Sequence, residues 1–447
     1  MKGLLEKLKN KHFLSLAGNG IMAILAMVTV AILYRFMPSK SEMGGWVFFQ
    51  TVFVLLDTFR TGFLQTALIK FYAGTTPPRS NEVLGSVWYL ASGISLVLFL
   101  VSLLLYFGTL FINNAELSVA LKWFGITFLC TLPLSIASWI LQADLAFDKL
   151  LLMRVVNQGS FIVFVLLLIV FNSLNLNTVL WANLLGCIIT SVMCMAFKWS
   201  HIATITQKTK DCVREIFHFG KYSVGTSIST NLLRSSDTFI IMFVMGTKGA
   251  AAIALYNIPM RLMEIIEIPL RSFLATGMPS ISAAFNKGDK KEVVFIMEKY
   301  AGMLTLGLFP VSILAVLLAN IAVGLIGGTE YMDTEAVTAY RIFMSFAFLY
   351  PIDRFIGVTL DIIHQPQINF IKVLVMLATN VIGDFAGLYL FGNINGVALA
   401  TFFTFSSGVF FGYYWLKKYL DISLKGIIKT GWKEISWVLQ TQVLKRK

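Results

Sequence analysis

The hydrophobic and polar positions of this chain alternate as whole segments. Twelve apolar stretches are separated by short polar loops. A helix needs ~20 apolar residues to cross a hydrocarbon core about 30 Å thick, and its backbone satisfies its own hydrogen bonds there. We therefore predict an all-α integral membrane protein. Its twelve transmembrane helices are expected at residues 13–37, 43–72, 83–111, 119–141, 150–172, 177–197, 220–245, 249–277, 300–326, 337–361, 369–391 and 395–416.

Lysine and arginine gather in every second polar segment and at both ends of the chain. The basic segments are residues 1–12, 198–221, 286–299 and 417–447. The loops on the other side contain only Lys40 and Lys248. Because basic loops stay on the cytoplasmic side, this pattern places both termini in the cytoplasm. The net charge of +13 then reflects topology and attraction to anionic lipids, and no soluble basic domain remains for nucleic acid.

The first six predicted spans resemble the last six. Asp57 precedes Glu267 by 210 residues, and Pro133 precedes Pro351 by 218. Six is an even number, so both copies insert in the same orientation, as in transporters built from parallel repeats. We predict two six-helix bundles in a V shape around a central cavity. The predicted domains are an N-terminal bundle (1–197), a cytoplasmic connector that acts as the hinge (198–219), a C-terminal bundle (220–416) and a cytoplasmic amphipathic tail (417–447).

The tail repeats apolar residues at helical spacing with lysines between them. These residues are Leu420, Leu424, Ile427, Ile428, Trp432, Ile435 and Val438. The pattern predicts an interfacial amphipathic helix on the cytoplasmic leaflet, and an unstructured basic tail is the alternative.

Ionisable residues concentrate in a few spans, although each costs at least ~2.5–3.5 kcal/mol at the centre of a membrane helix. Three pairs have i,i+3 spacing and one has i,i+4 spacing: Asp57/Arg60, Arg234/Asp237, Arg261/Glu264 and Glu267/Arg271. Residues at this spacing share a helix face and can neutralise each other. The pairs are therefore either internal salt bridges or arginines that line a wet cavity and are held by carboxylates. The guanidinium fork suits a phosphate.

Two further features of the central spans invite interpretation. The start of the seventh span is densely polar from Tyr222 to Asp237, which either lines an aqueous path or holds helices together. Pro259 and Pro269 flank the most charged part of the eighth span, where we expect a bend with a mechanical role. The four cysteines include no Cys-x-x-Cys pair and the four histidines have no ligand spacing, which predicts no disulfide, metal or cofactor.

Several segments resemble the polysaccharide transporter branch of the multidrug/oligosaccharidyl-lipid/polysaccharide (MOP) exporter superfamily, and the O-antigen (Wzx-type) flippases most. They are the basic start MKGLLEKLKNKHFLSLAGNG, the turn SEMGGWVFFQ, the stretch SSDTFIIMFVMGTKGAAAIALYNIPMRLMEIIEIP and the exit GMPSISAAFNKGDKKE. The resemblance covers essentially all twelve spans.

The resemblance implies a flippase that exports undecaprenyl-diphosphate-linked oligosaccharide units for surface polysaccharide, in the bacterial cytoplasmic membrane, by alternating access. Expected headgroup contacts are Arg60, Arg234, Arg261 and Arg271, with Asp57, Asp237, Glu264 and Glu267 as orienting or proton-coupling carboxylates. Expected partners are the lipid-linked oligosaccharide and membrane lipids, with a polysaccharide polymerase or glycosyltransferases as further candidates.

Two other functions compete with this one. A cation-coupled small-molecule or multidrug exporter has the same fold and predicts a more acidic or aromatic cavity. A membrane enzyme of glycan assembly tends to carry a large external loop with catalytic residues, whereas the external loops here are short and hold no histidine. We therefore expect a transporter and not an enzyme.

Overall fold

The chain is helical throughout the part described by the computed structural model, residues 11–109 and 115–444, with no strand in these ranges. The end residues of the predicted basic segments lie outside this part: Lys2, Lys7, Lys9, Lys445, Arg446 and Lys447. The described residues form two compact units. Unit 1 comprises the described residues within Met1–Thr238 and Met245–Ala254, and unit 2 comprises those within Phe239–Val244 and Leu255–Lys447. The domain boundaries drawn from the internal repeat stay a prediction.

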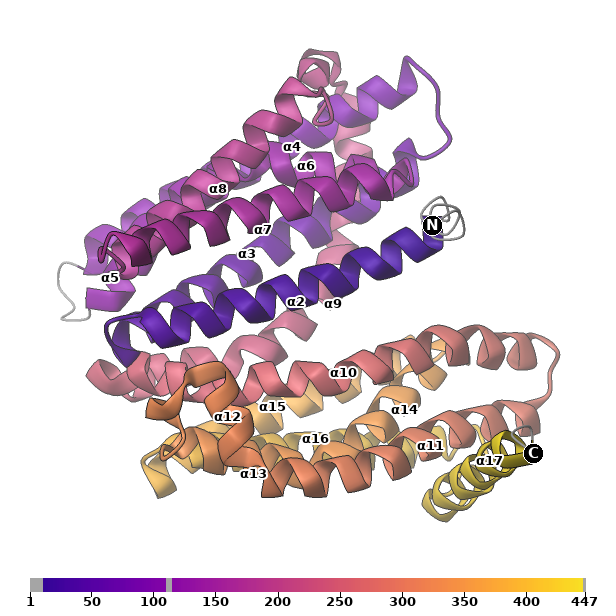
Figure 1. Ribbon diagram of the computed structural model, residues 1–447. Helices are drawn as coiled ribbons and strands as arrows, with labels where there is room; N and C mark the ends of the chain where they lie inside the picture. Colours follow the sequence, from indigo (N-terminus) through magenta and orange to yellow (C-terminus); the bar gives the residue numbers. More distant parts are fainter. Residues whose placement is uncertain (1–10, 110–114, 445–447) are drawn as a thin grey trace. The chain divides into compact units, whose positions relative to one another are not determined.

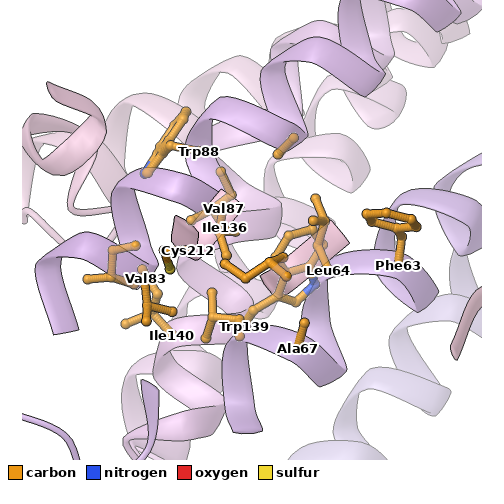
Figure 2. Packing of buried hydrophobic residues seen from close by; sticks show 14 of the residues in the cluster. Phe63, Leu64, Ala67, Val83, Val87, Trp88, Ile136, Trp139, Ile140 and Cys212 are labelled. Carbon is orange, nitrogen blue, oxygen red and sulfur yellow. The ribbon is translucent and has the colours of Figure 1, made fainter. Parts of the chain in front are cut away.

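Unit 1 is a bundle of long helices (Figure 1). Its elements are α2 (Lys11–Phe36), α3 (Lys40–Tyr72), α4 (Arg79–Thr109), α5 (Ala115–Cys130), α6 (Leu132–Ala143), α7 (Phe147–Val170), α8 (Leu176–Ala196), the 3₁₀ helix η1 (Ile202–Gln207) and most of α9 (Lys210–Val244). Within it α4 packs on α5, and α7 packs on both α8 and α2. An apolar cluster joins α3, α4, α6 and α9 through Leu64, Val87, Trp139 and Cys212, among others (Figure 2).

The predicted connector is fastened to unit 1. Trp88 on α4 donates a hydrogen bond from Nε1 to the carbonyl of Ser200 (2.7 Å). A Cβ at Gly85 would lie 2.2 Å from the carbonyl oxygen of Thr204, so η1 rests directly on the backbone of α4. The segment predicted as a hinge is therefore packed against one unit over much of its length.

Unit 2 is also built from helices, and α17 (Leu424–Leu444) is the last of them (Figure 1). Its elements are most of α10 (Gly249–Asn286), α11 (Lys290–Leu317), α12 (Ala319–Gly327), η3 (Thr329–Tyr331), α13 (Glu335–Phe346), η4 (Ala347–Leu349), α14 (Tyr350–Ile362), α15 (Pro366–Phe391), α16 (Ile394–Leu416) and α17. The 3₁₀ helix η2 (Gly246–Lys248) and the start of α10 belong to unit 1. The α15–α16 hairpin is the most extensively packed pair. Its backbones meet at Gly387, where a Cβ would lie 2.4 Å from the carbonyl oxygen of Gly396.

The helices have the length and apolar surface that a bilayer requires. Among the described residues, nine helices are long and apolar enough to cross a membrane, or ten if the bent pair α5–α6 is one span. Large apolar side chains point outward, including Leu104 (71% exposed) and Val170 (77% exposed). Such surfaces are unfavourable in water and favourable in lipid. The predicted all-α membrane fold is confirmed, and the count of twelve spans stays a prediction.

Breaks divide some predicted spans into two helices. The fourth span is broken at Thr131, where α5 and α6 differ in direction by 48°. The tenth contains the 3₁₀ turn η4 between α13 and α14. Pro133 lies in the first turn of α6, and Pro351 lies in the first turn of α14. The first turn of a helix tolerates a missing N–H. By contrast, α10 continues as one helix through Pro259 and Pro269.

The predicted tail helix is present as α17 and packs on α11. A Cβ at Gly302 would lie 2.0 Å from the carbonyl oxygen of Ile427, so the two backbones are in close contact. The buried carboxylate of Glu298 accepts hydrogen bonds from the backbone N–H of Ser423 (3.3 Å) and from Oγ1 of Thr430 (3.1 Å). Close backbone packing and this carboxylate together fix α17 on unit 2.

Candidate functional site

The first predicted charge pair lies in the middle of α3. Nη2 of Arg60 is 2.5 Å from Oδ1 of Asp57, and Oγ1 of Thr61 donates to the other oxygen of that carboxylate (3.2 Å). The spacing puts one turn of helix between the residues, as predicted. The two side chains differ in exposure: that of Arg60 is 0% exposed and that of Asp57 is 31% exposed. The carboxylate, not the guanidinium, is therefore the group that α3 presents at the surface of unit 1.

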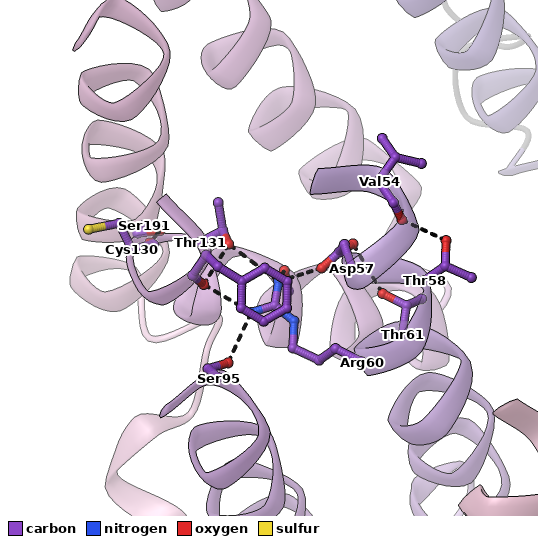
Figure 3. A network of polar contacts seen from close by, with 11 residues as sticks. Val54, Asp57, Thr58, Arg60, Thr61, Ser95, Cys130, Thr131 and Ser191 are labelled. Atoms are coloured by element: carbon purple, nitrogen blue, oxygen red, sulfur yellow. Dashed lines mark hydrogen bonds and ion pairs between the residues drawn. The ribbon is translucent and has the colours of Figure 1, made fainter. Parts of the chain in front are cut away.

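Arg60 is enclosed by neutral oxygen acceptors from three other elements (Figure 3). Its guanidinium donates to Oγ of Ser95 (3.3 Å), the carbonyl of Phe128 (3.1 Å), Oγ1 of Thr131 (3.3 Å) and Oγ of Ser135 (2.8 Å). The central guanidinium carbon, Cζ, also lies 4.0 Å from the centroid of the Phe128 ring. A buried charge is tolerated only when most of its hydrogen bonds are supplied in this way. Here Nη1 and Nη2 are bonded, whereas Nε has no acceptor among the described residues.

The second pair, on α9, is split between surface and interior. Arg234 is exposed, whereas Asp237 is only 5% exposed. The neighbouring Ser235 and Ser236 are also buried, and each hydroxyl donates to a carbonyl of α9, that of Ser235 to Asn231 (2.7 Å). The hydroxyl groups of these two serines are therefore bonded to carbonyls of their own helix. Arg234 lies at the surface of α9.

The last two pairs lie on α10 in unit 2 and are the most exposed. Arg261 binds Glu264 (3.1 Å), with side chains 38% and 57% exposed. Arg271 binds Glu267 (2.7 Å), with side chains 68% and 17% exposed. Both pairs form as their spacing predicts. Exposed ion pairs contribute little to the stability of a fold. Stability alone therefore does not explain why an apolar helix contains these four charges.

A further buried pair joins two helices and was not recognised as a pair in the sequence. Nζ of Lys372 on α15 is 2.7 Å from Oδ1 of Asp353 on α14, and the side chains are 4% and 6% exposed. Two glycines leave room for the lysine: a Cβ at Gly357 would lie 3.2 Å from Nζ, and one at Gly412 would lie 3.0 Å from Cδ. The partners are 19 residues apart, so no helical spacing signals the contact.

The structure thus brings six of the eight predicted residues together as three local pairs. Asp57 joins Arg60, Arg261 joins Glu264 and Arg271 joins Glu267. Within residues 11–109 and 115–444, no three histidine, cysteine, aspartate or glutamate side chains are grouped so as to hold a metal ion.

Long apolar helices with charged pairs inside them define a multi-pass membrane protein, and its fold is that of the MOP superfamily. It is similar to the structure titled "Lipid II flippase MurJ, inward closed conformation", with TM-score 0.74, 16% identity and coverage of 96% of this chain and 92% of that one. An inward-facing "multidrug resistance MATE family transporter of the MOP superfamily" gives TM-score 0.71, 13% identity and coverage of 88% and 93%. A MOP superfamily transporter from Pyrococcus furiosus gives TM-score 0.58, 14% identity and coverage of 92% and 93%.

The sequence identifies the family within this fold. The chain belongs to a family of polysaccharide biosynthesis proteins, whose family model matches residues 32–336. No curated protein sequence matches the chain. The predicted membership of the polysaccharide branch of the superfamily is therefore confirmed.

Proposed function

We propose that this protein is a flippase that moves lipid-linked oligosaccharide, with an undecaprenyl-diphosphate carrier, across the bacterial cytoplasmic membrane by alternating access. The observation that carries the proposal is the match of residues 32–336 to polysaccharide biosynthesis proteins, on a fold shared with a lipid II flippase. The diphosphate supplies a multiply charged anion, and the sugars supply hydroxyl groups.

The exposed arginines of α10 are the best candidates for the diphosphate. The side chain of Arg271 is 68% exposed and that of Arg261 is 38% exposed, and each binds one carboxylate among the described residues. An arginine fork binds phosphate oxygens in a bidentate manner at any accessible pH. An incoming diphosphate would replace Glu264 and Glu267 as the acceptor. Arg234, also exposed, is a further candidate on α9.

Arg60 belongs to a different category. Its guanidinium is fully buried and already has five acceptors, so binding a headgroup would require that enclosure to open. We propose Asp57 as the functional group of this pair, because part of its carboxylate is exposed. It can orient a ligand or accept a proton during the cycle.

Transport in proteoliposomes tests the function. Vesicles would contain an undecaprenyl-diphosphate-linked oligosaccharide labelled on its sugar, and an added glycosidase would cleave only externally exposed label. With the protein present, the protected pool becomes accessible. If it stays protected while the same vesicles transport a cationic drug, the multidrug-exporter alternative replaces this proposal.

The orientation is a separate part of the proposal. We propose that the N-terminus, the 286–290 loop and α17 face the cytoplasm, because these are basic segments of the chain and basic segments stay on the cytoplasmic side. In cells, variants with a single cysteine, either Lys40→Cys or Lys290→Cys, would be treated with a membrane-impermeant thiol reagent. Labelling at Lys40 alone supports the orientation, and labelling at both positions contradicts it.

We also propose that α17 lies in the anionic headgroup region of the cytoplasmic leaflet. Opposite its contact with α11 it exposes Leu424 (44%), Ile428 (53%) and Trp432 (63%). Lys425, Lys429 and Lys433 form an adjacent stripe at i,i+4 spacing. An apolar stripe beside a basic stripe matches the boundary between acyl chains and acidic headgroups.

A further inference from the structure

The break in the fourth span leaves main-chain carbonyl groups that an unbroken helix would satisfy. The last four carbonyls of α5, those of residues 127–130, lie beyond regular helical bonding. Thr131 N donates to the first of them, at Thr127 (3.0 Å). Pro133 has no N–H, so it has nothing to donate to the carbonyl of Leu129. The break therefore needs hydrogen-bond donors from outside its own backbone.

Side chains from two neighbouring helices supply such donors (Figure 3). Arg60 on α3 donates to the carbonyl of Phe128 (3.1 Å), which also accepts from Oγ1 of Thr131 (2.9 Å). Ser191 on α8 donates from Oγ to the carbonyl of Cys130 (2.7 Å). The carbonyls on either side of Leu129 are therefore satisfied by side chains.

Arg60 also connects the two halves of the broken span. Nη1 binds Phe128 at the end of α5, and Nη2 binds Ser135 in the first turn of α6 (2.8 Å). It further binds Thr131 at the break itself (3.3 Å). A planar guanidinium donates in fixed directions, so contacts to both halves restrict the angle between them.

Unit 2 shows a related arrangement beside its own broken span. Pro351 lies in the first turn of α14, directly after η4. Nζ of Lys372, on the neighbouring α15, donates to the carbonyl of Asp353 (3.1 Å) as well as to its carboxylate. Each unit thus has a buried cation bound to a main-chain carbonyl near the proline of a broken span, but Lys372 binds Asp353 within α14, whereas Arg60 binds both halves of its span. Pro133 and Pro351 are also a pair in the predicted internal repeat.

We propose that Arg60 is a positioning residue that holds the joint at Thr131 at a fixed angle. Through its bond to Arg60, Asp57 is then held in a position that the fourth span determines. This inference concerns the mechanics of unit 1, and it holds for any transported substrate.

The test is a double-mutant cycle between the cation and the proline. Arg60→Gln removes the charge and most of the donors. Pro133→Ala supplies an N–H for the carbonyl of Leu129 and so permits a continuous helix, in which the N–H of Leu132 would serve the carbonyl of Phe128 in place of Arg60. If Arg60 compensates for the break, the drop in melting temperature caused by Arg60→Gln is smaller in the Pro133→Ala background than in the wild type. Ser95→Ala serves as the matched control, because Ser95 binds Arg60 but is not at the break. Its effect should add to that of Pro133→Ala. Additive effects for Arg60→Gln as well would overturn the proposal.

A distance measurement reports the angle directly. Spin labels at Lys122 and Leu145, exposed positions near the two ends of the broken span, report their separation in a background without the native cysteines. We expect Arg60→Gln to broaden or shift this distance distribution and Arg60→Lys to shift it less. If Arg60→Gln does not fold, Ser191→Ala, which removes the donor to Cys130, provides the same readout with a smaller shift. An unchanged distribution in the folded variants would refute the joint.

Discussion

The guanidinium of Arg60 and the carboxylate of Asp57 are 2.5 Å apart, yet the first is fully buried and the second is about one-third exposed. The pair therefore connects the interior of unit 1 to its surface. Four neutral acceptors hold the arginine independently of the carboxylate. This asymmetry makes Arg60 the structural partner of the ion pair and leaves Asp57 as the partner for which we propose a function.

Asp57→Asn should preserve the fold better than Arg60→Met does. The asparagine variant loses one charge-assisted hydrogen bond, worth about 1.5–3 kcal/mol, and leaves the four neutral acceptors in place. Arg60→Met removes five hydrogen bonds at once. Thermal unfolding in detergent measures both, with Thr58→Val as a control on the same helix, since Thr58 is half-buried and its hydroxyl donates to the carbonyl of Val54 in its own helix (2.8 Å). A larger drop in melting temperature for Asp57→Asn than for Arg60→Met would mean that the carboxylate is essential for burying the arginine.

Arg261→Ala and Arg271→Ala should each reduce transport of lipid-linked oligosaccharide without reducing protein abundance. A charge-assisted contact to phosphate is worth about 1.5–3 kcal/mol, or about a 10-fold to 100-fold loss in rate. Arg→Lys variants should retain part of the activity, because a point charge replaces a bidentate fork. Arg341→Ala is the matched control: Arg341 is an exposed arginine of unit 2 bound to Asn320 (2.8 Å). Full activity in both α10 variants would remove these residues from the site.

Lys372→Met and Asp353→Asn should each destabilise unit 2 strongly. Breaking a buried ion pair by removing one partner costs about 3–5 kcal/mol, because the other charge stays buried. The double variant Lys372→Met/Asp353→Asn should lose less stability than the two single variants lose when their losses are added. Melting temperatures in detergent provide the comparison. Simple additivity would show that the two charges do not stabilise each other.

Gly431→Val should detach α17 from α11. A Cβ at Gly431 would lie 2.4 Å from the backbone of Gly302, and neither backbone can move without separating the helices. Limited proteolysis should then cleave α17 faster than in the wild type. Gly307→Ala on α11 is the control, since no atom lies within 4 Å of a Cβ at that position. Equal cleavage rates for Gly431→Val and the wild type would argue against the close contact.

Replacing Lys425, Lys429 and Lys433 with glutamine should weaken the response of transport to anionic lipid. Each lysine near an acidic membrane contributes about 1 kcal/mol. In proteoliposomes, wild-type activity should rise with the fraction of phosphatidylglycerol, and the triple variant should respond less. A triple variant at Lys287, Lys290 and Lys291, in and just after the 286–290 loop, keeps the same net charge as a control. An identical response in the wild type and the α17 variant would exclude this role.

The sequence by itself determined the features that depend on neighbours along the chain. Membrane helices follow from apolar length, and the pairs Asp57/Arg60, Arg261/Glu264 and Arg271/Glu267 follow from helical spacing. The family is likewise encoded in the linear sequence, since the family model matches residues 32–336 directly.

Only the tertiary structure decided which charges are buried and which are exposed. Arg60 and Arg271 look alike in sequence, each one helical turn from a carboxylate, but one is enclosed by three neighbouring elements and the other faces outward. The pair Lys372–Asp353 and the packing of α17 on Glu298 also depend on contacts between separate helices. Helical periodicity fixes the face on which a residue lies, whereas burial depends on which other helix packs against that face.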